Sequence, residues 1–317
     1  MSESKTIVVK APAKINLTFA IKGKMPDGYH EVETLMQSVT LEDELIFHIA
    51  PAEAQSMTLT WMAPAGAQPG VGQEVPADEK NLVLRAASLY LARTNRPNIE
   101  LKVILKKNIP MAAGMGGGSS DAAATLVALN KYFGNEISSE SLELMAQELG
   151  ADVPFCVQGG TQIGRGRGDD LEQVDVQHKY SFCIIKPKMI SIGTPWIYKE
   201  YDSFMAKGGG AAKIPLEEAV SALRTNDLLS AARSFTNAFT PIVFQHYPEL
   251  RELEEQTLRL GALSCHMTGS GPTMVALCQN EEYCRQVCAG VIANDESVDV
   301  WVVQSLSSGP RFVLDKS

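Results

Sequence analysis

In its N-terminal half the chain reads Ile109-Pro110-Met111-Ala112-Ala113-Gly114-Met115-Gly116-Gly117-Gly118-Ser119-Ser120-Asp121. Residues 99–105 before it alternate between apolar and more polar positions, which predicts a strand. Apolar residues recur at helical spacing from Ala122 to Phe133 after it. The pattern therefore predicts a strand, a glycine loop and a helix, with Ser119 or Ser120 as N-cap and Asp121 in the first helical turn.

Such a loop is suited to binding an anion. Glycines leave the backbone free to take positive φ and to approach a ligand closely. The helix start adds unpaired N–H groups and the positive end of its dipole, so phosphate is the expected ligand. Two familiar phosphate loops do not fit, because no lysine follows the glycines and Ser119 replaces the third glycine of a dinucleotide fingerprint. Lysine must reach the phosphates from elsewhere, and Lys14 and Lys107 are the nearest candidates.

Size and composition narrow the class of protein. A chain of 317 residues with 45% hydrophobic and 21% charged residues is expected to be globular, with two domains. The sequence shows no apolar run of about 18 residues and no targeting signal, so we expect a cytoplasmic protein with no membrane segment. The 28 Lys and Arg against 37 Asp and Glu give a net charge of −9, which argues against general nucleic-acid binding.

The six cysteines have no CxxC pair. Cys284 and Cys288 are four residues apart and could share one helix face, with His266 as a third metal ligand. Buried, reduced thiols are the preferred interpretation.

Patterns elsewhere predict an α+β fold. In the N-terminal half we expect a half-buried strand at 15–21, a turn at 25–28, an extended segment at 29–40, an exposed loop at 63–76 and a helix at 81–93. In the C-terminal half we expect strands at 182–186, 262–267, 273–277 and 298–303, with helices at 216–228, 249–260 and 281–293. This second order is close to the split βαβ, ferredoxin-like arrangement. We place the domain boundary at 165/166, giving domains 1–165 and 166–317.

Five sequence blocks carry a resemblance to a known family. The glycine loop resembles the phosphate loop of the GHMP kinases, which include galactokinase, homoserine kinase, mevalonate kinase and phosphomevalonate kinase. The other blocks are Pro12-Ala13-Lys14-Ile15-Asn16-Leu17, Asp27-Gly28-Tyr29-His30-Glu31-Val32-x-Thr34-Leu35, Gly150-Ala151-Asp152-Val153-Pro154-Phe155 and Thr268-Gly269-Ser270-Gly271-Pro272. Together they resemble the 4-diphosphocytidyl-2-C-methyl-D-erythritol kinases of the non-mevalonate isoprenoid pathway. The resemblance implies a two-domain GHMP kinase fold, with an N-terminal ribosomal-protein-S5-like domain and a C-terminal ferredoxin-like domain.

The resemblance also implies a reaction and its residues. These kinases transfer the ATP γ-phosphoryl group to a 2-hydroxyl, so Asp152 would be the base and Lys14 the cation beside it. The ATP phosphates would bind Pro110, Met111, Ala112, Ala113, Gly114, Met115, Gly116, Gly117, Gly118, Ser119 and Ser120. Asn81 and Lys107 would lie near the adenine, although a helix N-cap is an equally good role for Asn81. Mg²⁺ would accompany ATP, with Ser119 or Ser120 and Asp121 as candidate ligands and the ligand set left open.

The acceptor would be a small cytidylated molecule. Tyr29 would stack on the cytosine and His30 would hydrogen-bond its edge, while Asn16 and Thr194 would lie near the methylerythritol. Gly269 and Ser270 would close the site against the phosphate loop, the alternative being a plain hairpin turn. The Arg-Gly-Asp triplet at 167–169 is treated as loop.

Other functions stay open at this point. A homoserine or mevalonate kinase would keep the glycine loop without needing residues 27–30, and a catalytically silent nucleotide-binding protein would need neither Lys14 nor Asp152. A dehydrogenase is disfavoured by the failed fingerprint. The chain departs from the resembled pattern at 63–76, which is longer, and at Met111-Ala112-Ala113, which is less glycine-rich. We expect a monomer or homodimer.

Overall fold

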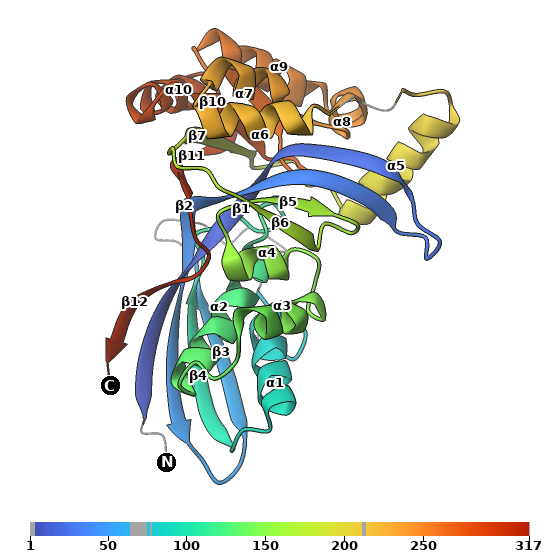
Figure 1. Ribbon diagram of the computed structural model, residues 1–317. Helices are drawn as coiled ribbons and strands as arrows, with labels where there is room; N and C mark the ends of the chain where they lie inside the picture. The colour runs from blue at the N-terminus through green and yellow to red at the C-terminus, as the bar shows by residue number, and fades with distance from the viewer. Residues whose placement is uncertain (1–3, 64–74, 77, 211–213, 317) are drawn as a thin grey trace.

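A computed structural model describes residues 4–63, 75–76, 78–210 and 214–316 (Figure 1). Most of the predicted 63–76 loop therefore lies outside the described residues. Among the helices of these ranges, none has the length and apolar character needed to cross a membrane.

Two long antiparallel strands run through the whole molecule. They are β1 (Lys5–Lys24) and β2 (His30–Pro51), joined by the predicted turn, in which Gly28 has φ of 88°. Both are much longer than the sequence patterns predicted. The sheet is extended by β4 (Ile99–Lys106), antiparallel to β2, and by β3 (Ser56–Met62), parallel to β4.

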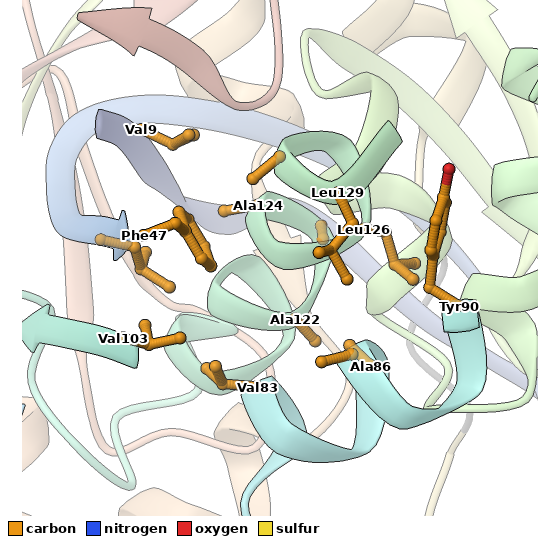
Figure 2. Packing of buried hydrophobic residues seen from close by; sticks show 14 of the residues in the cluster. Val9, Phe47, Val83, Ala86, Tyr90, Val103, Ala122, Ala124, Leu126 and Leu129 are labelled. Atoms are coloured by element: carbon orange, nitrogen blue, oxygen red, sulfur yellow. The ribbon is translucent and has the colours of Figure 1, made fainter. Parts of the chain in front are cut away.

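Four helices cover one face of this sheet (Figure 1). They are α1 (Leu82–Thr94), α2 (Gly117–Tyr132), α3 (Ser139–Gln147) and α4 (Val153–Gln158). Figure 2 shows Ala122 and Ala124 of α2 among the larger side chains of Phe47, Val83 and Val103. Because these alanines are small, α2 packs closely between α1 and the sheet, and this fixes the position of the glycine loop at its start.

The C-terminal half has the ferredoxin-like arrangement predicted from its pattern. Its antiparallel strands lie in the order β11-β7-β10-β9, with α10 between β10 and β11 in the chain. The strands are β7 (Ser181–Pro187), β9 (Ser264–Met267), β10 (Met274–Cys278) and β11 (Val298–Leu306), and the last helix is α10 (Glu281–Asn294). Between β7 and β9 the chain forms α5 (Thr194–Ala206), α6 (Leu216–Thr225), α7 (Leu228–Ser234), β8 (Thr236–Asn237), α8 (Thr240–His246) and α9 (Pro248–Arg259).

The single helix expected at 216–228 is two helices. Asn226 takes a left-handed conformation with φ of 58°, which ends α6. Asp227 then caps α7 by accepting a hydrogen bond from the Ser230 N–H at 3.0 Å.

Several strands join the two halves. β5 (Thr161–Arg165) pairs with β2 and with β6 (Asp170–Val174), and β11 pairs with β2 at its end. The last strand, β12 (Arg311–Lys316), returns to pair with β1 beside the N-terminus (Figure 1). The proposed boundary at 165/166 lies in the turn between β5 and β6, and it stays a prediction.

β1 contributes to three hydrophobic cores in succession. Residues 7–11 belong to the core under α1 and α2, residues 13–17 to a middle core, and Phe19 and Ile21 to the core under α5 and α8. The strand expected at 15–21 forms as part of β1, but its expected half-burial is wrong, because every residue from Ala11 to Ile21 is buried. The polar side chains of Asn16 and Thr18 have hydrogen-bond partners instead of facing solvent: Asn16 Nδ2 donates to the Thr34 hydroxyl at 2.7 Å, and the Thr18 hydroxyl accepts the Leu35 N–H at 3.0 Å.

All six cysteines are buried and free, as expected. Across the described part of the chain, no group of three or more His, Cys, Asp or Glu side chains is arranged to hold a metal ion. The alternative metal site at Cys284, Cys288 and His266 is therefore not formed.

Candidate active site

The glycine loop leads directly into α2. Gly116 is the N-cap, with φ of 66°, and the helix begins at Gly117. The expected serine N-cap is therefore wrong, because the N-cap lies three residues before Ser119 and four before Ser120, and both serines are already inside the helix. The Ser120 hydroxyl instead donates to the Pro12 carbonyl at 2.7 Å, which ties the helix to β1. Asp121 lies beyond the first turn.

The start of α2 offers unused hydrogen-bond donors. Ser120 N–H is the first to bond within the helix, to the Gly116 carbonyl at 2.8 Å. The N–H groups of Gly117, Gly118 and Ser119 have no hydrogen-bond partner among the described residues. Three converging N–H groups at a helix start form a site for an anion such as phosphate.

The loop separates two cavities. One, of about 390 Å³, is lined by residues 110–119 together with Asn81, Lys107 and Asp121. The other, of about 320 Å³, is lined by Lys14, Asn16, Asp152, Thr194, Gly269 and Ser270. We call them the loop cavity and the acceptor cavity. Gly114, Gly116 and Ser119 line both, so a group held at the loop is accessible from either side.

Larger hollows elsewhere do not reach this region. One of about 420 Å³ lies beside Arg311 and one of about 550 Å³ beside Arg85, and neither is lined by the glycine loop or Asp152.

Lys14 and Asp152 meet in the acceptor cavity. Lys14 Nζ is 3.3 Å from Asp152 Oδ2 and donates to Asn16 Oδ1 at 2.9 Å. The lysine side chain is 7% exposed and the aspartate side chain 39%. The lysine is therefore held in place by the residues that bury it, while the carboxylate faces the cavity. Asp152 stands at the N-cap position of α4 but makes no capping hydrogen bond. Its carboxylate is therefore free to accept a proton from a ligand.

The loop and Lys14 are in close contact. The Lys14 N–H donates to the Met115 carbonyl at 3.0 Å. A Cβ placed on Gly116 would lie 2.9 Å from Lys14 Cγ, closer than carbon atoms normally approach. Glycine at 116 thus allows both the positive φ and the approach of the lysine stem.

The 268–271 turn packs against the loop across the two halves of the chain, as the resemblance implied. A Cβ on Gly114 would lie 3.0 Å from the Thr268 carbonyl oxygen, and one on Gly269 would lie 3.2 Å from the Gly114 carbonyl oxygen. Thr268 Oγ1 accepts a hydrogen bond from the Asn16 N–H at 2.8 Å. Thr194 and Ser270 hydroxyls are 3.2 Å apart at the cavity wall.

His266 lies behind this turn, and sequence reasoning missed its contact with the site. Its Nε2 is 3.2 Å from the Asn16 carbonyl oxygen, and Nδ1 has no partner in the part that the structure describes. Burial lowers the pKa of His266 to about 4, so the ring is neutral near pH 7. A neutral ring with its proton on Nε2 donates to Asn16 and supports the strand beneath Lys14.

Lys107 belongs to a buried ion cluster at the wall of the loop cavity. It pairs with Asp43, a residue not singled out in the sequence, and with Asp121 Oδ2 at 2.9 Å. Burial raises the pKa of Asp121 to about 8, although Lys107 opposes the shift. Burial alone would lower the pKa of Lys107, but Asp121 and Asp43 outweigh it and raise that pKa. Asp43 Oδ1 also accepts the N–H groups of Asn108 and Ile109, which fixes the chain entering the loop.

Asn81 serves as the N-cap of α1 while lining the loop cavity. Its Oδ1 accepts the Val83 N–H at 2.9 Å, and its Nδ2 donates to the Pro76 carbonyl at 2.6 Å. The N-cap alternative is therefore confirmed, and the adenine contact stays a prediction.

Tyr29 and His30 do not line either cavity but contact residues that do. Tyr29 is 59% exposed, with the Arg167 guanidinium 4.1 Å from its ring centre. His30 Nε2 is 2.7 Å from Asp202 Oδ1, and its ring lies 4.8 Å from that of Tyr198. Arg167 and Tyr198 both line the acceptor cavity. The cytosine roles of Tyr29 and His30 stay predictions.

Comparison with known proteins points to one group. The family described as GHMP kinases N terminal domain matches residues 81–160, and GHMP kinases C terminal matches residues 219–294. The chain is 38% identical to the 4-diphosphocytidyl-2-C-methyl-D-erythritol kinase of Pelotomaculum thermopropionicum, over 92% of this chain and 96% of the relative. A crystal structure of a 4-(cytidine 5′-diphospho)-2C-methyl-D-erythritol kinase superposes with a TM-score of 0.76 at 28% identity, covering 94% of this chain and 99% of the other. Homoserine kinase from Cytophaga hutchinsonii superposes with a TM-score of 0.74 at 21% identity, covering 97% of each chain, a likeness of fold alone.

Proposed function

The chain belongs to the 4-diphosphocytidyl-2-C-methyl-D-erythritol kinase family of the GHMP kinases, and on that basis we propose that it uses ATP to phosphorylate the 2-hydroxyl of 4-diphosphocytidyl-2-C-methyl-D-erythritol in the non-mevalonate isoprenoid pathway. The observation that carries the proposal is the glycine loop standing between two cavities, with the Asp152 carboxylate in the second. The ATP phosphates bind at the loop and the acceptor hydroxyl lies against Asp152.

The reaction then follows from positions and charges. Asp152 takes the proton of the hydroxyl, whose oxygen forms a bond to the γ-phosphorus while the bond to the β–γ bridging oxygen breaks and ADP leaves. The N–H groups of Gly117 and Gly118 hold the phosphates in place. Lys14 lies beside the carboxylate and offsets negative charge on the group in transfer.

The residues at the loop fit a magnesium ion bound together with ATP. Ser119 lines both cavities, and Asp121 lines the loop cavity and has a buried carboxylate oxygen, Oδ1, without a partner among the described residues. Mg²⁺ prefers such oxygen ligands and is usually held by one or two of them together with substrate phosphates. Bound there, it would neutralise phosphate charge. Ser120 is the poorer candidate, because it is buried and bonded to Pro12.

The proposal also includes four expectations from the sequence. They are a cytoplasmic location, a monomeric or homodimeric state, no nucleic-acid partner, and two domains at 1–165 and 166–317. They follow from the sequence and are independent of the reaction.

A substrate panel tests the proposed function. The purified protein is incubated with ATP and Mg²⁺ and with the cytidylated methylerythritol, homoserine or mevalonate, and ADP release is measured. We expect rapid release with the cytidylated substrate only. Preferred turnover of homoserine or mevalonate would place the chain with another GHMP activity, and no release with any substrate would indicate a silent nucleotide-binding protein.

A further inference from the structure

The acceptor cavity has little positive charge to offer. The charged side chains that line it in the described part of the chain are Lys14, Asp152 and Arg167. Lys14 is already committed to Asp152 and Asn16. The proposed acceptor carries a diphosphate between its cytidine and its methylerythritol, so it brings negative charge that Lys14 does not balance.

Arg167 is held at the cavity by a fixed turn. The turn joins β5 to β6, and the Gly166 carbonyl accepts the Val32 N–H of β2 at 2.8 Å. Gly166 and Gly168 have φ of 66° and 96°, values that suit glycine and let the turn be tight. Val32 and Gly168 also line the cavity, so Arg167, the residue after it and the β2 residue bonded to the turn all belong to its wall.

The Arg167 guanidinium is held in one orientation but keeps N–H donors that could bind a ligand. Its Nη2 donates to Asp27 Oδ2 at 2.6 Å, and its plane lies over Tyr29 with 4.1 Å from the carbon to the ring centre. The two charged side chains are 46% and 44% exposed, and an ion pair that exposed is weak. A guanidinium has five N–H donors, so others remain for a phosphate oxygen, and its planar fork matches phosphate geometry.

We propose that Arg167 binds the diphosphate of the cytidylated acceptor, with Asp27 and Tyr29 holding the guanidinium in position. The inference rests on the proposed function, since a diphosphate must be present in the acceptor. It gives a role to the Arg-Gly-Asp triplet that sequence reasoning treated as loop.

Arg165 provides a matched control in the same turn. It pairs with Glu172 at 2.7 Å and with Glu33 at 3.8 Å, and it does not line the acceptor cavity. Arg167→Gln therefore removes a positive charge at the cavity wall, and Arg165→Gln removes the same charge two residues away from it in the chain, off the wall.

The test compares CDP with cytidine as inhibitors competing with the acceptor. For Arg167→Gln we expect the inhibition constant of CDP and KM for the acceptor to rise about tenfold, as for loss of a charge-assisted hydrogen bond. In the same variant, the inhibition constant of cytidine and KM for ATP should change less than about twofold. Arg165→Gln should leave both inhibition constants and both KM values unchanged. Arg167→Lys, which keeps the charge, should recover part of the CDP affinity.

The ratio of the two inhibition constants is taken within each variant, so a smaller active fraction does not alter it. An unchanged ratio in Arg167→Gln, whether both constants rise equally or neither rises, would overturn the role of Arg167 in diphosphate binding. Equal weakening would instead indicate that Arg167 acts by supporting Tyr29. Failure of the wild-type protein to turn over the cytidylated substrate would refute the proposed function itself, which is a separate result.

Discussion

Replacing Gly116 with alanine should damage both the stability and the turnover of this protein. The new Cβ would lie 2.9 Å from Lys14 Cγ and 3.3 Å from Lys14 Cε. Because the lysine is buried and Cγ is near the backbone, the side chain cannot simply turn aside. The substitution therefore shifts the cation that lies 3.3 Å from Asp152.

The size of the effect has two parts. A non-glycine residue in the left-handed region, here φ of 66°, costs about 1–2 kcal/mol. Overpacking against Lys14 adds roughly 1–3 kcal/mol. A combined loss of about 2–5 kcal/mol lowers Tm by roughly 3–8 °C for a chain of this size. Displacement of Lys14 and the loop should lower kcat by roughly 10- to 100-fold.

Thermal unfolding and steady-state kinetics at saturating ATP measure both parts. Gly23→Ala is the control, because Gly23 lines neither cavity, its Cβ would have no atom within 4 Å beyond its chain neighbours, and in the extended strand β1 alanine is favoured over glycine by roughly 0.5–1 kcal/mol. We expect its Tm to be equal or higher and its kcat to be near that of wild type. A Gly116→Ala protein with wild-type Tm and kcat would refute the close approach of loop and lysine.

Three further outcomes are expected. Asp152→Asn should lower kcat at least ~100-fold with ATP affinity retained, and near-normal turnover would exclude Asp152 as the base. Because its carboxylate is 39% exposed and, among the described residues, is paired with Lys14 alone, the loss of stability should stay within about 1 kcal/mol. The pKa of His266 is about 4 in the folded protein and 6.5 in the unfolded chain, so the folded state binds fewer protons between these pH values. The free energy of unfolding should therefore fall by on the order of 3 kcal/mol as the pH drops from about 6.5 to about 4. His266→Gln should flatten that part of a Tm-against-pH curve relative to wild type, and parallel curves would contradict the assignment. Asn81→Ala should lower the free energy of unfolding by about 1 kcal/mol through loss of the α1 N-cap, measured by urea titration, whereas an unchanged midpoint would mean that the cap is dispensable.

The elements next to the glycine loop could be predicted because their signals are local. Alternation marked β4, helical spacing marked α1 and α2, and turn residues marked the β1–β2 connection. The N-cap of α2 could not be placed in the same way, since serine is the common choice and only the packing of Gly116 on Lys14 selects the earlier start. Burial of the polar face of β1 was also beyond local patterns, because a second core covers it.

The residues of the candidate site likewise divide into those with a local sequence signal and those without one. The loop, Lys14 and Asp152 stand in short motifs and could be singled out from the sequence, and the structure brings them together. Asp43 and Arg167 could not, because their contacts are made across 64 and 140 residues of chain and nothing in their neighbours signals them.

The course of β1 has a mechanical consequence. One strand supplies side chains to three successive cores and carries Lys14 in the middle one, so neither half can melt while leaving β1 intact for the other. Two family domains would then lose structure in one concerted transition instead of two, and activity would disappear at the same temperature as the fold.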